Sequence, residues 1–178
     1  MSTSPNSSDL AEPPPFPWVY AYQEDGPRLG GITLRPVVPV SLEGPLGAGS
    51  PVFALVDSGC SHTLAAPWLA DDIGVRPSES DVELKIGIGG RSHLVKFTPV
   101  TMRLYPPGPA GDDAFAEWED LVGFVEHWLP TWPVLVGQDA FMKAFTVTMS
   151  RHAQAVAIEA GDAFDRRFPP PPAPVADG

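Results

Sequence analysis

Apolar residues along this chain occur in short runs and alternating stretches, separated by segments rich in glycine and proline. The run Phe53–Val56 predicts a buried strand, and Ser58-Gly59 just after it predicts a turn. Pro133–Gly137 predicts a second buried strand. Between them, Val82–Leu104 alternates on two arms around Gly89-Gly90, which can take the positive φ angles of a tight hairpin turn. Short strands and hairpins therefore dominate the predicted elements.

Two further segments in the first half give less regular patterns. Ile32–Leu42 alternates loosely, but Pro36 and Pro39 cannot donate to a ladder, so an edge strand or a bulge is expected. Pro67–Ile73 predicts a short helix, because proline suits the first helical position and Gly74 suits a left-handed cap. The residues of this helix expected to face inward are Trp68, Leu69 and Ile73.

The last third of the chain predicts a short helix and a closing hairpin. The helix is expected over Gln138–Ala144, with Phe141 and Phe145 four residues apart on one face. Phe145–Met149 and Ala153–Ile158 follow as the two arms of the hairpin.

A carboxylate stands where the first buried strand ends, at Asp57. Charged side chains are rarely fully buried, and an unpaired buried charge costs several kcal/mol. This position therefore needs hydrogen-bond donors, which Ser58, Gly59 and the backbone beyond them can supply.

Three segments together resemble a known family. Val56-Asp57-Ser58-Gly59 resembles the Asp-Thr/Ser-Gly signature of aspartic proteases. Pro133–Phe141 is similar to the hydrophobic-hydrophobic-Gly element of the retropepsin-like, single-domain branch, and Leu84–Val95 is similar to its flap hairpin. The resemblance covers roughly Ile32–Ile158. It implies a mostly β fold: a retropepsin-like acid-protease closed β-barrel with a flap hairpin and one or two short helices.

The resemblance also implies roles for individual residues. Asp57, Ser58 and Gly59 would form the catalytic loop, in which Ser58 hydrogen-bonds across a two-fold axis and Gly59 lets a backbone amide approach the carboxylate. The flap residues expected to bind substrate are Ile86, Gly87, Ile88, Gly89 and Gly90. The structural residues expected near the site are Leu135, Val136 and Gly137.

Amide hydrolysis in this family, as the resemblance implies, uses two aspartates around one water, one ionised and one protonated. This chain carries one such signature, and Asp139 is no substitute because it lies at a predicted helix start. A homodimer would place two Asp57 side chains across a two-fold axis. The expected function is therefore that of an aspartic endopeptidase acting on a peptide or protein substrate, with no metal and no cofactor.

The segment Phe115–Leu129 is ambiguous, because its apolar residues fit an amphipathic helix although Gly123 sits in the middle. The resemblance implies a strand over about Asp120–Glu126, and the strand is favoured.

The length of 178 residues suggests one domain with tails. The protease-like domain is expected over residues 18–160, between a disordered tail (1–17) and a proline-rich tail (161–178). Trp18–Tyr22 is expected to be a strap or an edge strand. The 23 prolines disfavour a helical bundle.

A formal net charge of −11 and a pI of about 4.6 argue against binding to nucleic acid or to anionic membrane surfaces. One cysteine excludes an internal disulfide and favours a reducing compartment. Met1–Pro15 lacks the pattern of a signal peptide, and no segment approaches the roughly 18 apolar residues of a membrane span. A cytoplasmic location is expected.

Several alternatives stay open. Asp57 would be a plain turn residue if the flanking strand were coincidental. Cys60 and His62 would form a thiol nucleophile and base only with an orienting third group. The histidines lack zinc spacing, and the glycines of Gly87–Gly90 lack the following helix of a phosphate cradle. A non-catalytic retropepsin-fold module for peptide binding or dimerisation is the alternative function.

Overall fold

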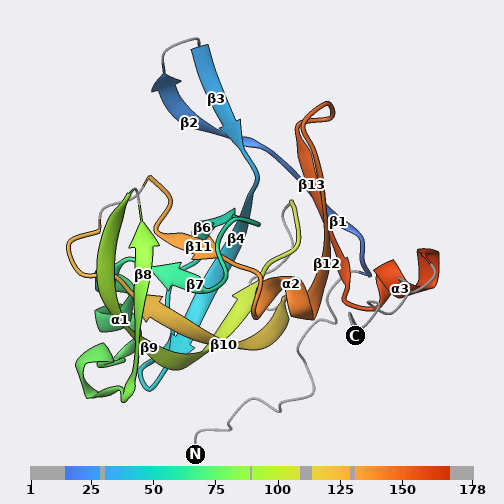
Figure 1. Cartoon of the computed structure of the whole chain (residues 1–178). Coiled ribbons are helices and arrows are strands. Elements are labelled where there is room, and N and C mark those ends of the chain that lie inside the picture. Colours follow the sequence, from blue (N-terminus) through green and yellow to red (C-terminus); the bar gives the residue numbers. More distant parts are fainter. Residues whose placement is uncertain (1–14, 29–30, 89, 109–113, 129–130, 169–178) are drawn as a thin grey trace, which may run out of the picture.

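The computed structural model describes residues 15–28, 31–88, 90–108, 114–128 and 131–168. The strands of its main body are β4 (Val37–Gly44), β6 (Val52–Val56), β7 (Thr63–Ala65), β9 (Arg91–Leu104), β10 (Ala116–Phe124) and β11 (Val134–Val136). They are neighbours in the order β4-β6-β11-β7-β10-β9, and β9 also pairs with β4, so the six strands close into a barrel (Figure 1). The prediction of a mostly β fold with a closed barrel is confirmed.

Other strands extend or flank the barrel. The short β5 (Gly47–Ala48) pairs with β4, and β8 (Val82–Ile88) pairs with β9 as a long hairpin. A separate antiparallel sheet has the order β1 (Trp18–Ala21), β13 (Ala155–Ala160), β12 (Phe145–Ser150). A further hairpin projects from the barrel (Figure 1). It consists of β2 (Gln23–Arg28) and β3 (Gly31–Arg35).

The helices are short. They are α1 (Pro67–Ile73), a 3-10 turn at Pro77–Glu79, α2 (Phe141–Ala144) and α3 (Ala163–Arg167). In α1, Pro67 is at the start and Gly74 caps the end with φ 73°, as predicted. Leu69 and Ile73 are buried, but Trp68 is 43% exposed, so its predicted inward orientation is wrong. Among the described residues, no helix is long and apolar enough to cross a membrane.

Strand β4 pairs with both β6 and β9, so the edge-strand prediction is wrong for the part of Ile32–Leu42 that starts at Val37. Ile32–Arg35 lies in β3, whose partner among the described strands is β2. The chain interrupts the strand at Pro36, whose carbonyl accepts the N–H of Val56 at 2.9 Å. Pro39 lies one residue before the β4–β9 ladder, which begins at Val40, and its carbonyl accepts the N–H of Tyr105 at 3.1 Å. Both prolines therefore contribute their carbonyls as acceptors, although neither has an N–H to donate.

The ambiguous segment is a strand, as favoured: β10 runs from Ala116 to Phe124. Its buried positions alternate, with Trp118, Asp120 and Val122 facing inward. Gly123 explains why the helical pattern misleads. A Cβ at this position would lie 2.8 Å from the Phe97 ring, so the glycine allows two strands to pack closely.

The C-terminal elements cover one end of the core. The rings of Phe141, Phe145 and Trp118 pack with centroids 5.2–5.5 Å apart, which confirms the predicted pairing of the two phenylalanines. The closing hairpin is confirmed as β12 and β13, and Trp18–Ala21 joins it as the predicted edge strand. Helix α2 begins at Phe141 rather than Gln138. The N–H groups of residues 138 and 139 instead bind the neighbouring loop.

We expect Gly123→Ala to lower the free energy of unfolding by about 1–3 kcal/mol, because the added methyl overpacks Phe97 and Val95. Gly87→Ala is the matched control, since a Cβ there meets no atom within 4 Å. Urea denaturation of the two variants measures the difference. Equal midpoints would show that the β9–β10 contact is not tight.

Candidate functional site

Asp57 is the first residue of the loop that follows β6. Its backbone N–H donates to the carbonyl of Val136 at 3.1 Å, and its carbonyl accepts the N–H of Cys60 at 3.1 Å. The side chain is half-buried, and its Oδ1 accepts the N–H of Gly59 at 2.9 Å. The carboxylate is thus oriented by the loop that carries it, as expected from the sequence.

Gln138 and Asp139 hold this loop in place through hydrogen bonds. The N–H of Gln138 donates to the carbonyl of Cys60 at 3.0 Å, and the N–H of Asp139 donates to the carbonyl of Ser61 at 2.8 Å. The side-chain amide of Gln138 also donates to the carbonyl of Ser58. Three carbonyls of the loop are therefore held by two consecutive residues.

Gly137 makes that approach possible. A Cβ at this position would lie 2.6 Å from the carbonyl oxygen of His62 and 2.7 Å from that of Cys60. Real Cβ contacts do not reach these distances with backbone atoms, so a larger residue would push the two segments apart. The structure places Gly137 directly against the loop, where the resemblance expects a structural glycine.

Asp57 and Ser58 line an open cleft of about 390 Å³. Its other lining residues are Asp25, Arg35, Pro36, Leu55, Val56, Thr131, Trp132, Leu135 and Met149. The Asp25 side chain is only 6% exposed, and its Oδ2 accepts a hydrogen bond from Arg35 Nε at 3.2 Å. Trp132 has a buried indole N–H with no hydrogen-bond partner among the described residues.

The flap candidates lie beside the loop but outside this cleft. The β8–β9 hairpin is confirmed, with Ile88 opposite Arg91 and Gly90 at φ 78°. Ile86 and Ile88 pack in a small apolar cluster that also includes Cys60 and Leu135. Of the predicted tip, Gly89 lies outside the described residues. The hairpin is therefore adjacent to the Asp57 loop and in contact with the same cluster.

His62 connects the loop to the start of α2. Its Nδ1 lies 3.1 Å from Asp139 Oδ2, which is an ion pair whenever the ring is protonated. Lys143 Nζ lies 3.9 Å from the other oxygen of Asp139, and the His62 ring packs edge-on against Phe97 at 5.1 Å. Asp139 thus faces two basic side chains rather than Asp57.

A buried carboxylate joins β7 to β10. Asp120 Oδ2 accepts the Thr63 hydroxyl at 2.6 Å and the indole N–H of Trp118 at 3.3 Å. Burial raises the pKa of Asp120, and these hydrogen bonds oppose that shift. The sequence pattern indicates that Asp120 faces inward, because it falls on the inward side of the β10 alternation. The sequence carried no comparable signal for Gln138 or Trp132.

The surroundings of Cys60 favour its neutral thiol form. Its Sγ–H donates to the carbonyl of His62 at 3.0 Å. Burial raises the pKa of Cys60, and the negative charges of Asp57 and Asp139 raise it further, although the hydrogen bond acts in the opposite direction. A nucleophilic cysteine needs a lowered pKa, so this environment opposes the thiol alternative. No group of three or more His, Cys, Asp or Glu residues that could hold a metal occurs in the described part of the chain.

The chain matches no protein-family model and no curated protein. Among solved structures it is similar to a retropepsin-like aspartic protease from Rickettsia conorii. The identity is 13% and the TM-score is 0.39, and the match covers 78% of this chain and 94% of the other. So remote a likeness leaves the function of this chain to be argued from its own residues.

We expect iodoacetamide to modify Cys60 slowly in the folded protein and to require a higher pH than an ordinary cysteine. The raised pKa leaves less thiolate at any given pH. Mass spectrometry over about pH 6 to 10, with urea-unfolded chain as the control, gives both rate profiles. Rapid modification of the folded protein near neutral pH would favour the thiol nucleophile.

Proposed function

We propose that this protein is an aspartic endopeptidase whose active site combines Asp57 from two copies of the chain. The proposal rests on the Asp57 loop, which hydrogen bonds hold in place. Its carboxylate accepts the Gly59 N–H at 2.9 Å, and residues 137–139 fix the loop from behind at the edge of an open cleft. A fixed, solvent-accessible carboxylate is what a general base for water activation requires.

The second carboxylate comes from a second copy because the nearby candidates in one chain are engaged. Asp25 shares the cleft, but its carboxylate is buried against Arg35. Asp139 faces His62 and Lys143. Two Asp57 side chains related by a two-fold axis would supply equivalent groups that share one proton.

The reaction then proceeds in two balanced steps. The ionised Asp57 takes a proton from water while the water oxygen bonds to the peptide carbonyl carbon, and the protonated Asp57 hydrogen-bonds the carbonyl oxygen. In the second step, the Asp57 that took the water proton passes it to the amide nitrogen, the C=O bond reforms and the C–N bond breaks. The products are a carboxylic acid and an amine, and the pair of Asp57 side chains again shares one proton. No metal or cofactor takes part in these steps.

The cleft suits an extended peptide. Leu55, Leu135 and Met149 offer apolar contacts for the side chains of a bound peptide. The hairpin of β8 and β9 would close over the bound peptide and exclude water, with Ile86–Gly90 at its tip. Strand-like binding with side-chain pockets is a common way to hold such a ligand.

The same cleft favours a second candidate, a non-catalytic module that binds peptides or forms dimers. Its apolar side chains would contact an extended peptide whether or not Asp57 is active. Cleavage of a peptide library at about pH 4 to 7 separates the two functions. Peptide binding without any cleavage would favour the module.

We expect Asp57→Asn to reduce peptide hydrolysis by roughly a thousandfold, because the amide cannot act as a base. Asp72→Asn is the matched control, since this exposed residue lies on α1. Steady-state rates and circular dichroism of both variants show whether activity is lost while the fold remains. Hydrolysis by the Asp57→Asn chain at the wild-type rate would exclude the mechanism.

We also expect activity to depend on dimerisation, so specific activity should rise with protein concentration and then level off. Moderate salt should help, because two copies with a net charge of −11 repel each other. Adding about a ninefold excess of Asp57→Asn chain should leave about a tenth of wild-type chains in fully wild-type dimers. Constant specific activity under conditions where light scattering reports only monomers would contradict the two-chain site.

A further inference from the structure

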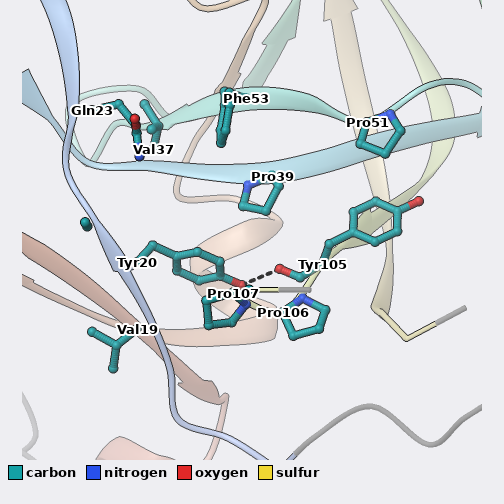
Figure 2. Close-up of a pocket in the computed structure, with 12 residues that line it drawn as sticks. Val19, Tyr20, Gln23, Val37, Pro39, Pro51, Phe53, Tyr105, Pro106 and Pro107 are labelled. Atoms are coloured by element: carbon teal, nitrogen blue, oxygen red, sulfur yellow. Dashed lines mark hydrogen bonds between the residues drawn. The ribbon is translucent and has the colours of Figure 1, made fainter. Parts of the chain in front are cut away.

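A second groove, of about 420 Å³, lies where β1, β4, β6 and the segment after β9 meet (Figure 2). Three aromatic residues, Tyr20, Phe53 and Tyr105, line it. The Tyr20 hydroxyl donates to the carbonyl of Tyr105 at 2.6 Å, and the Tyr105 hydroxyl shares a hydrogen bond with Ser41 Oγ at 2.8 Å. Hydrogen bonds therefore connect β1, β4 and the chain after β9, and they fix the walls of the groove.

The lining of this groove is distinctive in a strongly acidic chain. Prolines come from three separate segments, at Pro39, Pro51 and Pro106-Pro107, and none of the lining residues is charged. The Asp57 cleft, by contrast, is lined by Asp25, Arg35 and Asp57. Large apolar side chains at the groove are also exposed, since Val19 is 53% and Phe53 is 46% accessible. Such a surface fits an uncharged, apolar ligand.

We propose that this groove binds the chain's own proline-rich C-terminal segment, residues 169–175, in the polyproline II conformation. The segment reads Pro-Pro-Pro-Pro-Ala-Pro-Val and has no charged side chain. Grooves lined by aromatic residues are the common receptors for polyproline II helices, because proline rings pack flat on aromatic rings and little chain entropy is lost. This contact is independent of the proposed peptidase function.

The hydrogen-bonding chemistry of the two partners also agrees. Proline has no N–H, so a proline-rich segment presents mainly carbonyl acceptors and requires donors from its receptor. The exposed side-chain amide of Gln23 lines the groove and can donate to such carbonyls. A ligand with many N–H groups would find fewer acceptors on a lining of rings and aliphatic side chains.

Helix α3 brings the start of this segment next to the sheet that borders the groove. Arg167 Nη2 lies 2.7 Å from Glu159 Oε2, so the chain leaves α3 beside β13. Strand β13 pairs with β1, and Val19, Tyr20 and Ala21 of β1 line the groove. Glu159 and Ala157, the partner of Val19, are two strand positions apart, or about 7 Å. Residues 169–175 span about 22 Å as polyproline II, which exceeds this distance.

The test uses the full chain, with its tail disabled by Pro170→Ala, Pro172→Ala and Pro174→Ala together. We expect amide NMR signals of Val19, Phe53 and Tyr105 to shift relative to wild type, while signals of the β8–β9 hairpin stay unchanged. Pro13→Ala with Pro14→Ala is the matched control in the other tail and should leave the groove signals in place. A free peptide of residues 168–178 should restore the wild-type shifts, with half-saturation at about 1 mM or below, because a tethered tail acts at an effective concentration near 1 mM.

A substitution in the groove provides a second, independent test. Phe53→Thr should weaken binding of this peptide to the tail-disabled chain at least about fivefold, whereas Val82→Thr, at a similarly exposed position of β8, should not. Unchanged groove signals, or no peptide binding, would overturn the proposal. Shifts that grow with protein concentration would also overturn it, since they would assign the groove to the tail of a second copy. None of these measurements depends on hydrolysis, so an inactive protein would still answer the question.

Discussion

The insertion of β11 between β6 and β7 is the constraint on which the rest of the site depends. The two outer strands are joined by the Asp57 loop, so the inserted strand reaches the loop at its base. Gly137 then lies against the loop carbonyls, and the next two N–H groups bind them. The position of one carboxylate is thus set by backbone hydrogen bonds, which leave little freedom once the strand is in place.

Carboxylates in and around the site differ because their surroundings differ. Asp57 is half-buried and held by one backbone N–H, whereas Asp120 is 7% exposed and bridges two strands through Thr63 and Trp118. Asp139 faces His62 and Lys143. Residues of the same type therefore serve as an accessible acceptor, an internal cross-link and a charge partner, according to burial and neighbours.

Local patterns in the sequence predicted the strands, turns and helices that are determined by neighbouring residues. The strand before Asp57, the glycine turn of the β8–β9 hairpin and the proline-to-glycine helix α1 all follow from neighbouring residues, although that strand is buried at alternate residues only and Phe53 is 46% exposed. Most of the errors came from contacts between residues distant in the sequence. Pro39 looked like a residue of an edge strand, but the ladder with β9 begins one residue later. Trp68 looked like a core residue, yet the helix turns it outward. The hydrogen bond from Gln138 to Ser58 joins residues 80 positions apart, and no pattern within either segment indicates it.

The order of the strands has a consequence for how the protein is made. Strand β6 finds its parallel partner β11 only after residues 134–136 have been synthesised, and β1 finds β13 later still. Until then the emerging chain carries unpaired apolar strands, which makes it vulnerable to aggregation. Pairings this distant in sequence also slow folding, because a long loop must close before any contact compensates for its lost entropy. The Asp57 loop therefore acquires its fixed shape only after residues 134–139 have been synthesised, and a chain truncated before residue 134 lacks the hydrogen bonds that hold the loop.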